Sequence, residues 1–261
     1  MLLRKLLFSV FIILTIFSVS CSDKDEVVDL LLEEEEEPIS EGDTTSTKED
    51  EVELPVKSDT LIFEEKNGIV AAEAEHFYKQ EKTDLREWFV SDKINKNDLP
   101  DNSLETASNN KFIQILPDTR VTHADELKVG VNFTNTPGEL AIISYKVKFN
   151  KTGRYYVWVR ALSTGSEDNG IHVGMDGKWP ESGKRMQWCE GRKKWTWTSK
   201  QRTIEEHCGI PYAIYLDVET AGVHDVHFSM REDGFRFDKF LLTQDSLYVP
   251  IGNGIDEVVE D

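Results

Sequence analysis

Between residues 61 and 250, apolar residues recur mostly at every second position, in short runs separated by turn residues. Alternation of this kind is typical of strands that bury one face. It predicts strands at residues 142–149, 154–160, 170–175, 213–218, 223–230 and 235–242. Residues 79–92 are ambiguous and also suit a short helix. No extended helical pattern competes with these strands. The chain is therefore predicted to be all-β, an antiparallel jelly-roll β-sandwich.

The turns between these runs have recognisable chemistry. Residues 150–153 and 221–222 contain turn residues, and Asp176 with Gly177 indicates a β-hairpin. The longest stretch without a clear strand pattern is 178–209. A loop of this length in a compact domain is usually functional, so the chemistry is expected there.

The first residues have the pattern of a processing signal. Arg4 and Lys5 precede an uncharged apolar run, 6–17, which is short for a membrane span. Small residues then lead into Cys21, which predicts a signal peptide over 1–20 and lipid attachment at Cys21. Position −3 is Ser18 rather than the usual leucine, so an ordinary secretory signal with an incidental cysteine is the alternative.

Residues 21–60 have the composition of a lipidated, acidic, disordered tether. After Cys21, residues 22–60 contain 16 acidic residues against three lysines, too polar to form a core. The acidic residues directly after Cys21 resemble the surface-export signal of Bacteroidetes lipoproteins. That resemblance implies an outer-membrane, lipid-anchored protein exposed at the cell surface. The tether holds −13 of the formal net charge of −19, so net acidity says little about the folded domain.

The sequence divides after the tether into a domain at 61–250 and a short acidic tail at 251–261. With Cys21 set aside, Cys189 and Cys208 remain, and an exported compartment favours a disulfide between them. A zinc ion held by the two cysteines and His207 is the alternative, although the spacing fits no usual zinc pattern.

Three segments stand in order along the domain: residues 69–77 (IVAAEAEHF), 153–161 (GRYYVWVRA) and 234–243 (GFRFDKFLLT). Together they resemble the carbohydrate-binding modules of families 6 and 35. They look still more like the related C-terminal module of family 115 glycoside hydrolases, whose end shares the Pro-x-Gly-x-Gly character of residues 250–254. The resemblance spans nearly the whole domain and implies a jelly-roll sandwich with a structural calcium ion.

The same resemblance implies that Glu73, Glu75 and Asp238 are the calcium ligands. Physical reasoning agrees, because Glu73 and Glu75 would point to the same side of a strand. Asp238 alternates with Phe240 on what is expected to be a core-facing side, where a hard cation would relieve a buried carboxylate. The alternative is a salt bridge to an arginine, with Arg154, Arg231 and Arg236 as candidates.

The loop 178–202 holds four of the six tryptophans, namely Trp179, Trp188, Trp195 and Trp197. Flat indole faces stack on the C–H faces of sugar rings, and aromatic side chains commonly line ligand sites. Among the basic residues of this loop, Arg192 and Lys194 would attract sulfate or carboxylate groups, and nearby Asn169 adds a polar group. The alternative is that the tryptophans cover the core and the basic residues form a solvated face.

These observations predict a non-catalytic surface lipoprotein that binds a polysaccharide rather than nucleic acid, beside glycan-degrading enzymes or an uptake complex. The sequence shows no nucleophile elbow, zinc-binding His-Glu-x-x-His or phosphate loop. Two alternatives stay open: a small polysaccharide-active enzyme such as a lyase, and a structural subunit of a surface glycan-uptake complex. In the resembled modules, sugar sites lie at the loop end and on the concave face, and the sequence does not choose between them.

Overall fold

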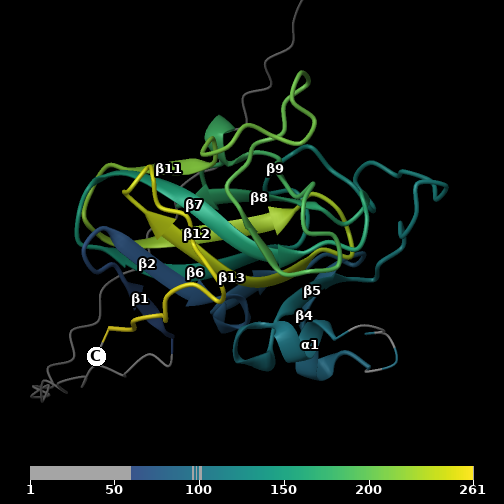
Figure 1. Ribbon diagram of the computed structural model, residues 1–261, viewed down its shortest axis with the longest axis horizontal. Coiled ribbons are helices and arrows are strands. Elements are labelled where there is room, and N and C mark those ends of the chain that lie inside the picture. The colour runs from purple at the N-terminus through teal and green to yellow at the C-terminus, as the bar shows by residue number, and fades with distance from the viewer. Residues whose placement is uncertain (1–59, 96, 98, 100–101, 261) are drawn as a thin grey trace, which may run out of the picture. The chain divides into compact units, whose positions relative to one another are not determined.

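Two β-sheets pack face to face in the computed structural model, which describes residues 60–95, 97, 99 and 102–260 (Figure 1). The predicted signal peptide, Cys21 and the tether to residue 59 lie outside the described residues. The described residues belong to one compact unit, 55–261. None of the described helices is long and apolar enough to cross a membrane.

The six-stranded sheet has the order β1 (Ile62–Glu64), β6 (Ile142–Phe149), β12 (Gly222–Met230), β8 (Gly170–Met175) and β9 (Met186–Gln187), with β3 (Lys79–Glu81) also on β6. The seven-stranded sheet has the order β10 (Thr196–Thr198), β7 (Gly153–Leu162), β13 (Arg236–Thr243), β5 (Ile113–Leu116) and β4 (Glu87–Val90), with β11 (Tyr215–Val218) on β7 and β2 (Ile69–Glu73) on β13. Except for the parallel pair of β1 and β6, neighbouring strands are antiparallel. The predicted all-β sandwich is confirmed.

The helices of the described chain are single turns at the ends of strands and in loops: η1 (Ala74–His76), η2 (Ser91–Lys93), α1 (Ser103–Thr106), η4 (Ser108–Asn110) and η5 (Glu181–Gly183). The ambiguous stretch 79–92 forms β3, β4 and the start of η2 rather than a helix. The long region 178–209 is not wholly a loop, because β9 and β10 lie inside it and extend the edges of the two sheets.

Alternation along β7 divides its side chains between the core and the outer face of the seven-stranded sheet. Tyr155, Val157 and Val159 are fully buried between the sheets, in one cluster with the aromatic residues of β12 and β13. Trp158 and Arg160 therefore point to the opposite, outer face, because side chains alternate along a strand. This outer face carries the candidate site.

A β-bulge in β13 explains why Asp238 does not face the core as predicted. The pairing of β13 with β7 shifts register between Phe237 and Lys239, so one extra residue stands at Asp238. Phe237 and Phe240 both belong to the core, and the bulge removes Asp238 from their alternation. Its carboxylate meets Arg160 of β7 instead.

Residues 251–260, set apart in the sequence as an acidic tail, pack on the domain. The Glu64 N–H donates to the Val258 carbonyl at 2.7 Å, and the Glu260 N–H donates to Ile62 at 2.8 Å. The Trp197 indole N–H donates to the Gly252 carbonyl at 3.0 Å. Figure 1 shows this C-terminal segment crossing in front of β2 and β13. The folded unit therefore continues past Pro250.

Candidate functional site

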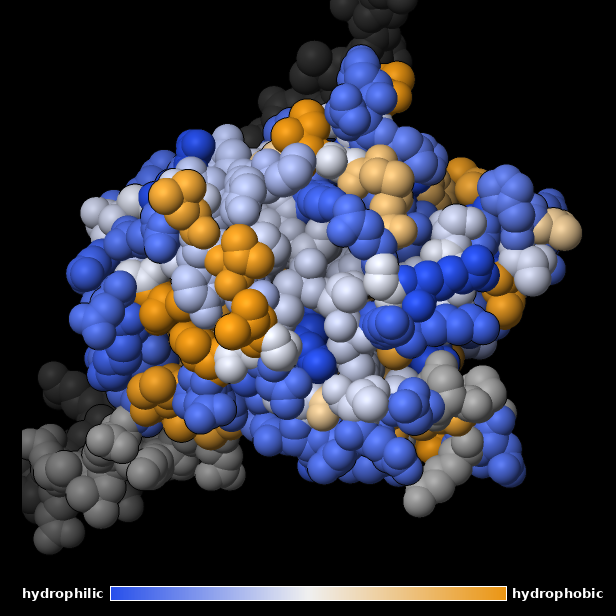
Figure 2. Space-filling model, in the orientation of Figure 1, coloured by the Kyte–Doolittle hydropathy of each residue, from blue (hydrophilic) through white to orange (hydrophobic). Residues whose placement is uncertain are grey.

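Four tryptophans line one surface cavity on the outer face of the seven-stranded sheet: Trp158, Trp195 and Trp197, with the mostly buried Trp188 beneath them. Trp158 comes from β7, Trp197 from β10 and Trp195 from the residues just before β10. Trp197 stands opposite Arg160 in the β10–β7 pairing, which places these two side chains on the same face. The cavity has a volume of about 360 Å³, and its charged lining consists of Arg160, Lys200 and Glu190. Figure 2 shows this face of the molecule, with a hollow near its centre.

The two loop tryptophans are held in place by their own indole N–H groups. Trp195 donates to the Ser103 carbonyl at 2.9 Å, and its ring packs 5.3 Å from Phe112. Trp197 donates to Gly252, and Gly254 lies so close that an added Cβ would come within 2.7 Å of the ring. Glycine at that position therefore lets the backbone support the indole. Both rings are half-buried and fixed before any ligand arrives.

Trp158 forms a more deeply buried part of the same cavity. Its ring is 7% exposed and lies edge-on to Tyr212, with centroids 5.6 Å apart. Its indole Nε1 is buried and has no hydrogen-bond partner among the described residues. Buried N–H groups nearly always have a partner, so this donor is available to an acceptor on a ligand.

The other two predicted tryptophans do not contribute a free ring. Trp188 is 3% exposed and belongs to the core, with its ring 5.0 Å from Phe235 and its N–H on the Thr196 carbonyl at 3.1 Å. Trp179 lies against Gly174 of β8, in the other sheet, and 6.1 Å from His227. Trp188 still lines the cavity from the core side, whereas Trp179 lies outside it, so the four predicted tryptophans do not form one exposed binding surface.

The predicted polar ligands are also dispersed. Asn169 is 4% exposed and its side-chain oxygen accepts from Gln187 at 2.6 Å, so it holds the fold together rather than facing a ligand. Lys194 is exposed, and Arg192 lines a different cavity, where it donates to the Thr164 carbonyl. The cations that line the aromatic cavity are Arg160 and Lys200, which pair with Asp238 and with Glu190, itself a lining residue.

Sequence reasoning missed Trp158 and Arg160 as site residues, although the signal was present. Both belong to the segment 153–161, which carries the family resemblance and a predicted strand but was not predicted to bind a ligand. Alternation with Tyr155, Val157 and Val159, all core residues, would have placed both on the opposite face.

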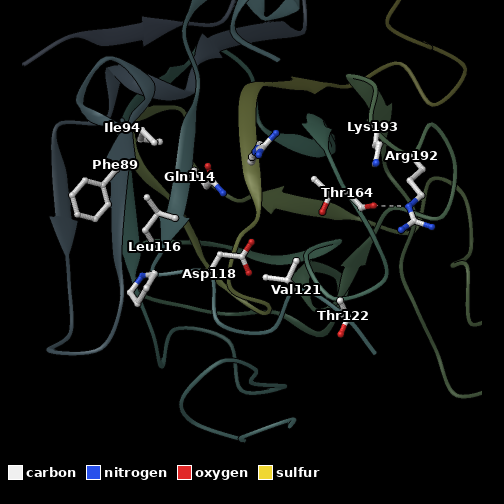
Figure 3. A pocket seen from close by; sticks show the side chains of 12 residues that line it. Phe89, Ile94, Gln114, Leu116, Asp118, Val121, Thr122, Thr164, Arg192 and Lys193 are labelled. Atoms are coloured by element: carbon white, nitrogen blue, oxygen red, sulfur yellow. Dashed lines mark hydrogen bonds between the residues drawn. The ribbon is translucent and has the colours of Figure 1, made fainter. Parts of the chain in front are cut away.

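The cavity that contains Arg192 is larger, about 950 Å³, and contains one carboxylate (Figure 3). Figure 3 shows Asp118 near its centre, with Thr164 and Arg192 on the far side. Burial and the nearby carboxylate of Asp233 raise the pKa of Asp118 to about 6. Its Oδ1 atom is buried without a hydrogen-bond partner among the described residues. A second acidic residue or a histidine, which an acid–base pair needs, is absent from the described lining.

The three predicted calcium ligands lie near one another, and two of them, Glu73 and Asp238, are paired with cations of the chain. Lys239 donates to Glu73 Oε1 at 2.8 Å, and Arg160 pairs with Asp238, whose Oδ1 also accepts from the Ser108 N–H at 2.7 Å. Burial raises the pKa of Glu75 to about 7, and the negative charges of Glu73 and Asp238 add to this effect.

The prediction that an arginine pairs with Asp238 is confirmed, but two of the arginines named from the sequence, Arg154 and Arg231, were wrong. Arg154 pairs with Asp217, Arg231 pairs with Glu232, and Arg160 is the residue that meets Asp238. Glu75 also does not continue the strand of Glu73, because β2 ends at Glu73 and η1 begins at Ala74.

Two observations bear on calcium at this cluster. Glu73 Oε2 and Glu75 Oε2 are buried without hydrogen-bond partners among the described residues, and carboxylate oxygens are the ligands that calcium prefers. Among all the residues that the structure describes, no group of three His, Cys, Asp or Glu side chains is arranged to hold a metal ion. One oxygen each of Glu73 and Glu75 therefore fits a hard cation, whereas Glu73 Oε1 is already paired with Lys239 and Asp238 with Arg160. Calcium stays a prediction.

Cys189 and Cys208 form the predicted disulfide, with their Cα atoms 5.4 Å apart. The bond closes the segment that contains β10, Trp195 and Trp197. Because the thiols are joined to each other, the zinc alternative is excluded for this pair.

No protein-family model matches the chain. Over 211 residues it is 62% identical to an uncharacterised protein, P23, of Formosa agariphila, a match that covers 79% of this chain and 51% of that protein. The chain thus spans about half the length of the curated relative that it matches.

Similar solved structures include a GH26-CBM35 β-(1,4)-mannanase of Podospora anserina, with a TM-score of 0.39 and 13% identity over 71% of this chain and 29% of that chain. The C-terminal CBM6 of LamC, a marine laminarinase of Zobellia galactanivorans, has a TM-score of 0.35 and 12% identity over 67% of this chain and 99% of that chain. These TM-scores are low. The β-sandwich is therefore assigned on the strand pairing of this chain itself.

Proposed function

We propose that this domain binds a polysaccharide in the cavity between Trp158, Trp195 and Trp197. The observation that carries the proposal is the convergence of these indoles on one cavity that also contains cationic side chains. A sugar ring has apolar C–H faces and a polar rim, so it requires flat aromatic surface and hydrogen-bonding groups together. Cavities of mainly apolar lining with a few placed polar groups are typical of ligand sites.

The arrangement is suited to binding with little reorganisation. Trp195 and Trp197 already have their N–H groups bonded to main-chain carbonyls, so a ligand does not have to immobilise them. Side chains that are ordered beforehand reduce the entropy lost on binding. The polar rim of the sugar would meet Arg160, which stays paired with Asp238, and the Lys200 ammonium at the edge of the cavity.

Replacing both Trp195 and Trp197 with alanine is expected to weaken polysaccharide binding at least tenfold. Loss of central aromatic side chains commonly costs about 2 kcal/mol or more of binding free energy. Affinity gel electrophoresis over laminarin, mannan, κ-carrageenan and alginate measures the retardation. Trp179→Ala is the matched control, because it removes a tryptophan from the other sheet and should leave retardation unchanged.

Two results would contradict this proposal. Unchanged retardation of the double variant, with an unchanged melting temperature, would remove the aromatic cavity as the binding site. Release of shortened or unsaturated oligosaccharides by the wild-type protein would favour the enzyme alternative. It would direct attention to Asp118, the carboxylate of raised pKa in the larger cavity.

Calcium at Glu73 and Glu75 is part of the proposal. The ion would bind their unpartnered oxygens and supply positive charge where carboxylates gather at the junction of β2 and η1. Calcium at 100 times its Kd would add about 2.7 kcal/mol of stability. For a domain of this size, each kcal/mol raises the melting temperature by about 2–4 °C. Differential scanning fluorimetry with calcium chloride and with EDTA measures the shift.

Glu75→Gln should abolish the calcium-dependent shift, whereas Glu81→Gln, on the surface at β3, should retain it. Equal melting temperatures of the wild-type protein in calcium and EDTA would contradict the proposal. In that case Lys239 and Arg160 are the cations that neutralise this cluster.

We also propose that Cys21 is lipidated and holds the domain at the outer face of the outer membrane. The proposal is supported by the sequence around Cys21, since the structure does not describe that region. Many copies on one membrane would bind one polysaccharide with raised avidity. Metabolic labelling with a fatty acid should mark the wild-type protein, and an unlabelled wild-type protein, or an equally labelled Cys21→Ala variant, would disprove the anchor.

A further inference from the structure

A second cavity, of about 450 Å³, contains an unusual concentration of arginines. It lies among the loops that follow β5, β7, β8, β10 and β12. Its charged lining combines four arginines, Arg120, Arg185, Arg202 and Arg231, with two glutamates, Glu167 and Glu232. Four positive charges against two negative charges leave an excess of +2 (4 − 2), in a chain whose formal net charge is −19.

The two glutamates are already engaged by part of this positive charge. Arg231 pairs with Glu232, and Glu167 accepts from His123 at 2.9 Å and lies 3.8 Å from Arg120. Within the described residues, Arg185 and Arg202 form no ion pair. Their guanidinium groups are therefore the ones in this cavity that are not in an ion pair, although Glu232 lies within electrostatic reach of Arg202 and Glu181 within reach of Arg185.

The buried arginines of the cavity also retain donors without partners. Arg231 is 2% exposed and Arg120 is 8% exposed, and the Nε atom of each is buried without a hydrogen-bond partner among the described residues. The Arg231 guanidinium lies 4.9 Å from the centre of the Phe133 ring, which fixes its plane. Burial and the charges of Arg202 and Arg185 lower the pKa of Arg231. A buried cation in this environment is stabilised by an added negative charge.

The backbone under the two unpaired arginines is held in a specific conformation. Arg185 has a φ of 54°, in the left-handed region that arginine rarely adopts. Its N–H donates to His172 Nδ1 at 2.9 Å, and the Arg202 N–H donates to the Arg185 carbonyl at 2.9 Å. Burial lowers the pKa of His172 to about 3, so this histidine is neutral and accepts the hydrogen bond. The cavity is therefore rigid on this side.

We propose that this cavity binds an anionic oxygen group, a sulfate ester or a carboxylate, carried by a polysaccharide. Guanidinium groups bind both kinds of group through paired N–H donors, and Arg185 and Arg202 supply the free charge. The inference rests on the proposed function in one respect, namely that the anionic group belongs to a polysaccharide. It adds a second site, separate from the aromatic cavity, that selects charged over neutral polysaccharides.

The experiment compares three polysaccharides that separate the possible sources. κ-Carrageenan has sulfate esters and no carboxylates, alginate has carboxylates and no sulfate, and laminarin is neutral. The wild-type protein should bind one or both charged polymers, with affinity that falls as sodium chloride rises. The variant Arg185→Gln/Arg202→Gln should lose at least tenfold in affinity for that polymer and keep any affinity for laminarin.

The matched control is Arg154→Gln, which removes one charge from an exposed pair with Asp217 elsewhere on the surface. It should leave binding of the charged polymer within twofold of the wild-type protein. The melting temperature of each variant verifies folding, and Arg185→Lys/Arg202→Lys provides a second test in which charge is kept but paired donors are lost. That variant should bind between the wild-type and glutamine forms.

Three outcomes would overturn the inference. They are failure of the wild-type protein to bind either charged polymer, equal affinity for charged and neutral polymers, and unchanged affinity in folded Arg185→Gln/Arg202→Gln. Failure of the proposed function would give a different result. In that case the Trp195→Ala/Trp197→Ala variant would bind polysaccharide as well as the wild-type protein does. The two results are therefore read independently.

Discussion

Arg86→Met is expected to lower the free energy of unfolding by about 3–5 kcal/mol, because it leaves a buried carboxylate without its cation. Arg86 is 3% exposed and Asp233 is fully buried, with Arg86 Nη2 2.8 Å from Asp233 Oδ2. The same oxygen accepts from the Thr119 N–H at 2.8 Å and from the Thr119 hydroxyl at 2.7 Å. Asp233, in the loop between β12 and β13, therefore holds both the loop between β3 and β4, through Arg86, and the loop after β5, through Thr119. Urea denaturation followed by circular dichroism measures the loss.

Two further variants make this result specific. Arg86→Met/Asp233→Asn removes both charges, so it should be more stable than Arg86→Met alone, since pairwise energies of contacting residues are not additive. Arg154→Met breaks the exposed pair with Asp217 and should cost about 1 kcal/mol or less. A loss below 1 kcal/mol for Arg86→Met would show that water or a neighbouring group neutralises Asp233.

Removing the disulfide by Cys189→Ala/Cys208→Ala is expected to lower the free energy of unfolding by about 3 kcal/mol. The bond joins residues 19 apart in sequence, and opening it increases the conformational freedom of the unfolded chain. Polysaccharide binding should weaken as well, because the released segment includes Trp195 and Trp197. Thermal unfolding and affinity gels measure the two effects.

Dithiothreitol provides the control for this prediction. It should lower the melting temperature of the wild-type protein towards that of Cys189→Ala/Cys208→Ala and leave the variant unaffected. A variant as stable as the wild-type protein would mean that hydrogen bonds such as Trp197 to Gly252 hold the segment without the disulfide.

The sequence predicted the bounds of the long strands well, but it predicted less well which face of a sheet a given side chain occupies. The strands β6 and β8 begin and end where alternation placed them, because both bury one face against the other sheet. The bulge at Asp238 could not be predicted, since an extra residue in a strand does not interrupt an apolar pattern visibly. The short strand β10 was missed because its three residues are too few to show alternation.

The candidate sites show a similar limit. Composition identified the tryptophan-rich segment, but whether an indole is free depends on what packs against it. Phe235 covers Trp188, and Gly174 approaches Trp179, and neither contact is visible in the sequence. The arginine cavity was missed altogether, because Arg120 and Arg231 are brought together only by the sheet topology.

The clamped position of β1 has a mechanical consequence. This strand is the first described element, and it pairs in parallel with β6 on one side while Phe63 pairs with Val259 on the other. If a membrane holds the chain at Cys21 and a bound polysaccharide pulls on the domain, tension enters at β1. Such a force acts along the strand, so the hydrogen bonds to β6 and to the C-terminal segment share the load at the same time. The pairing of β1 on both sides would thus resist unfolding by a force applied to the chain ahead of this strand.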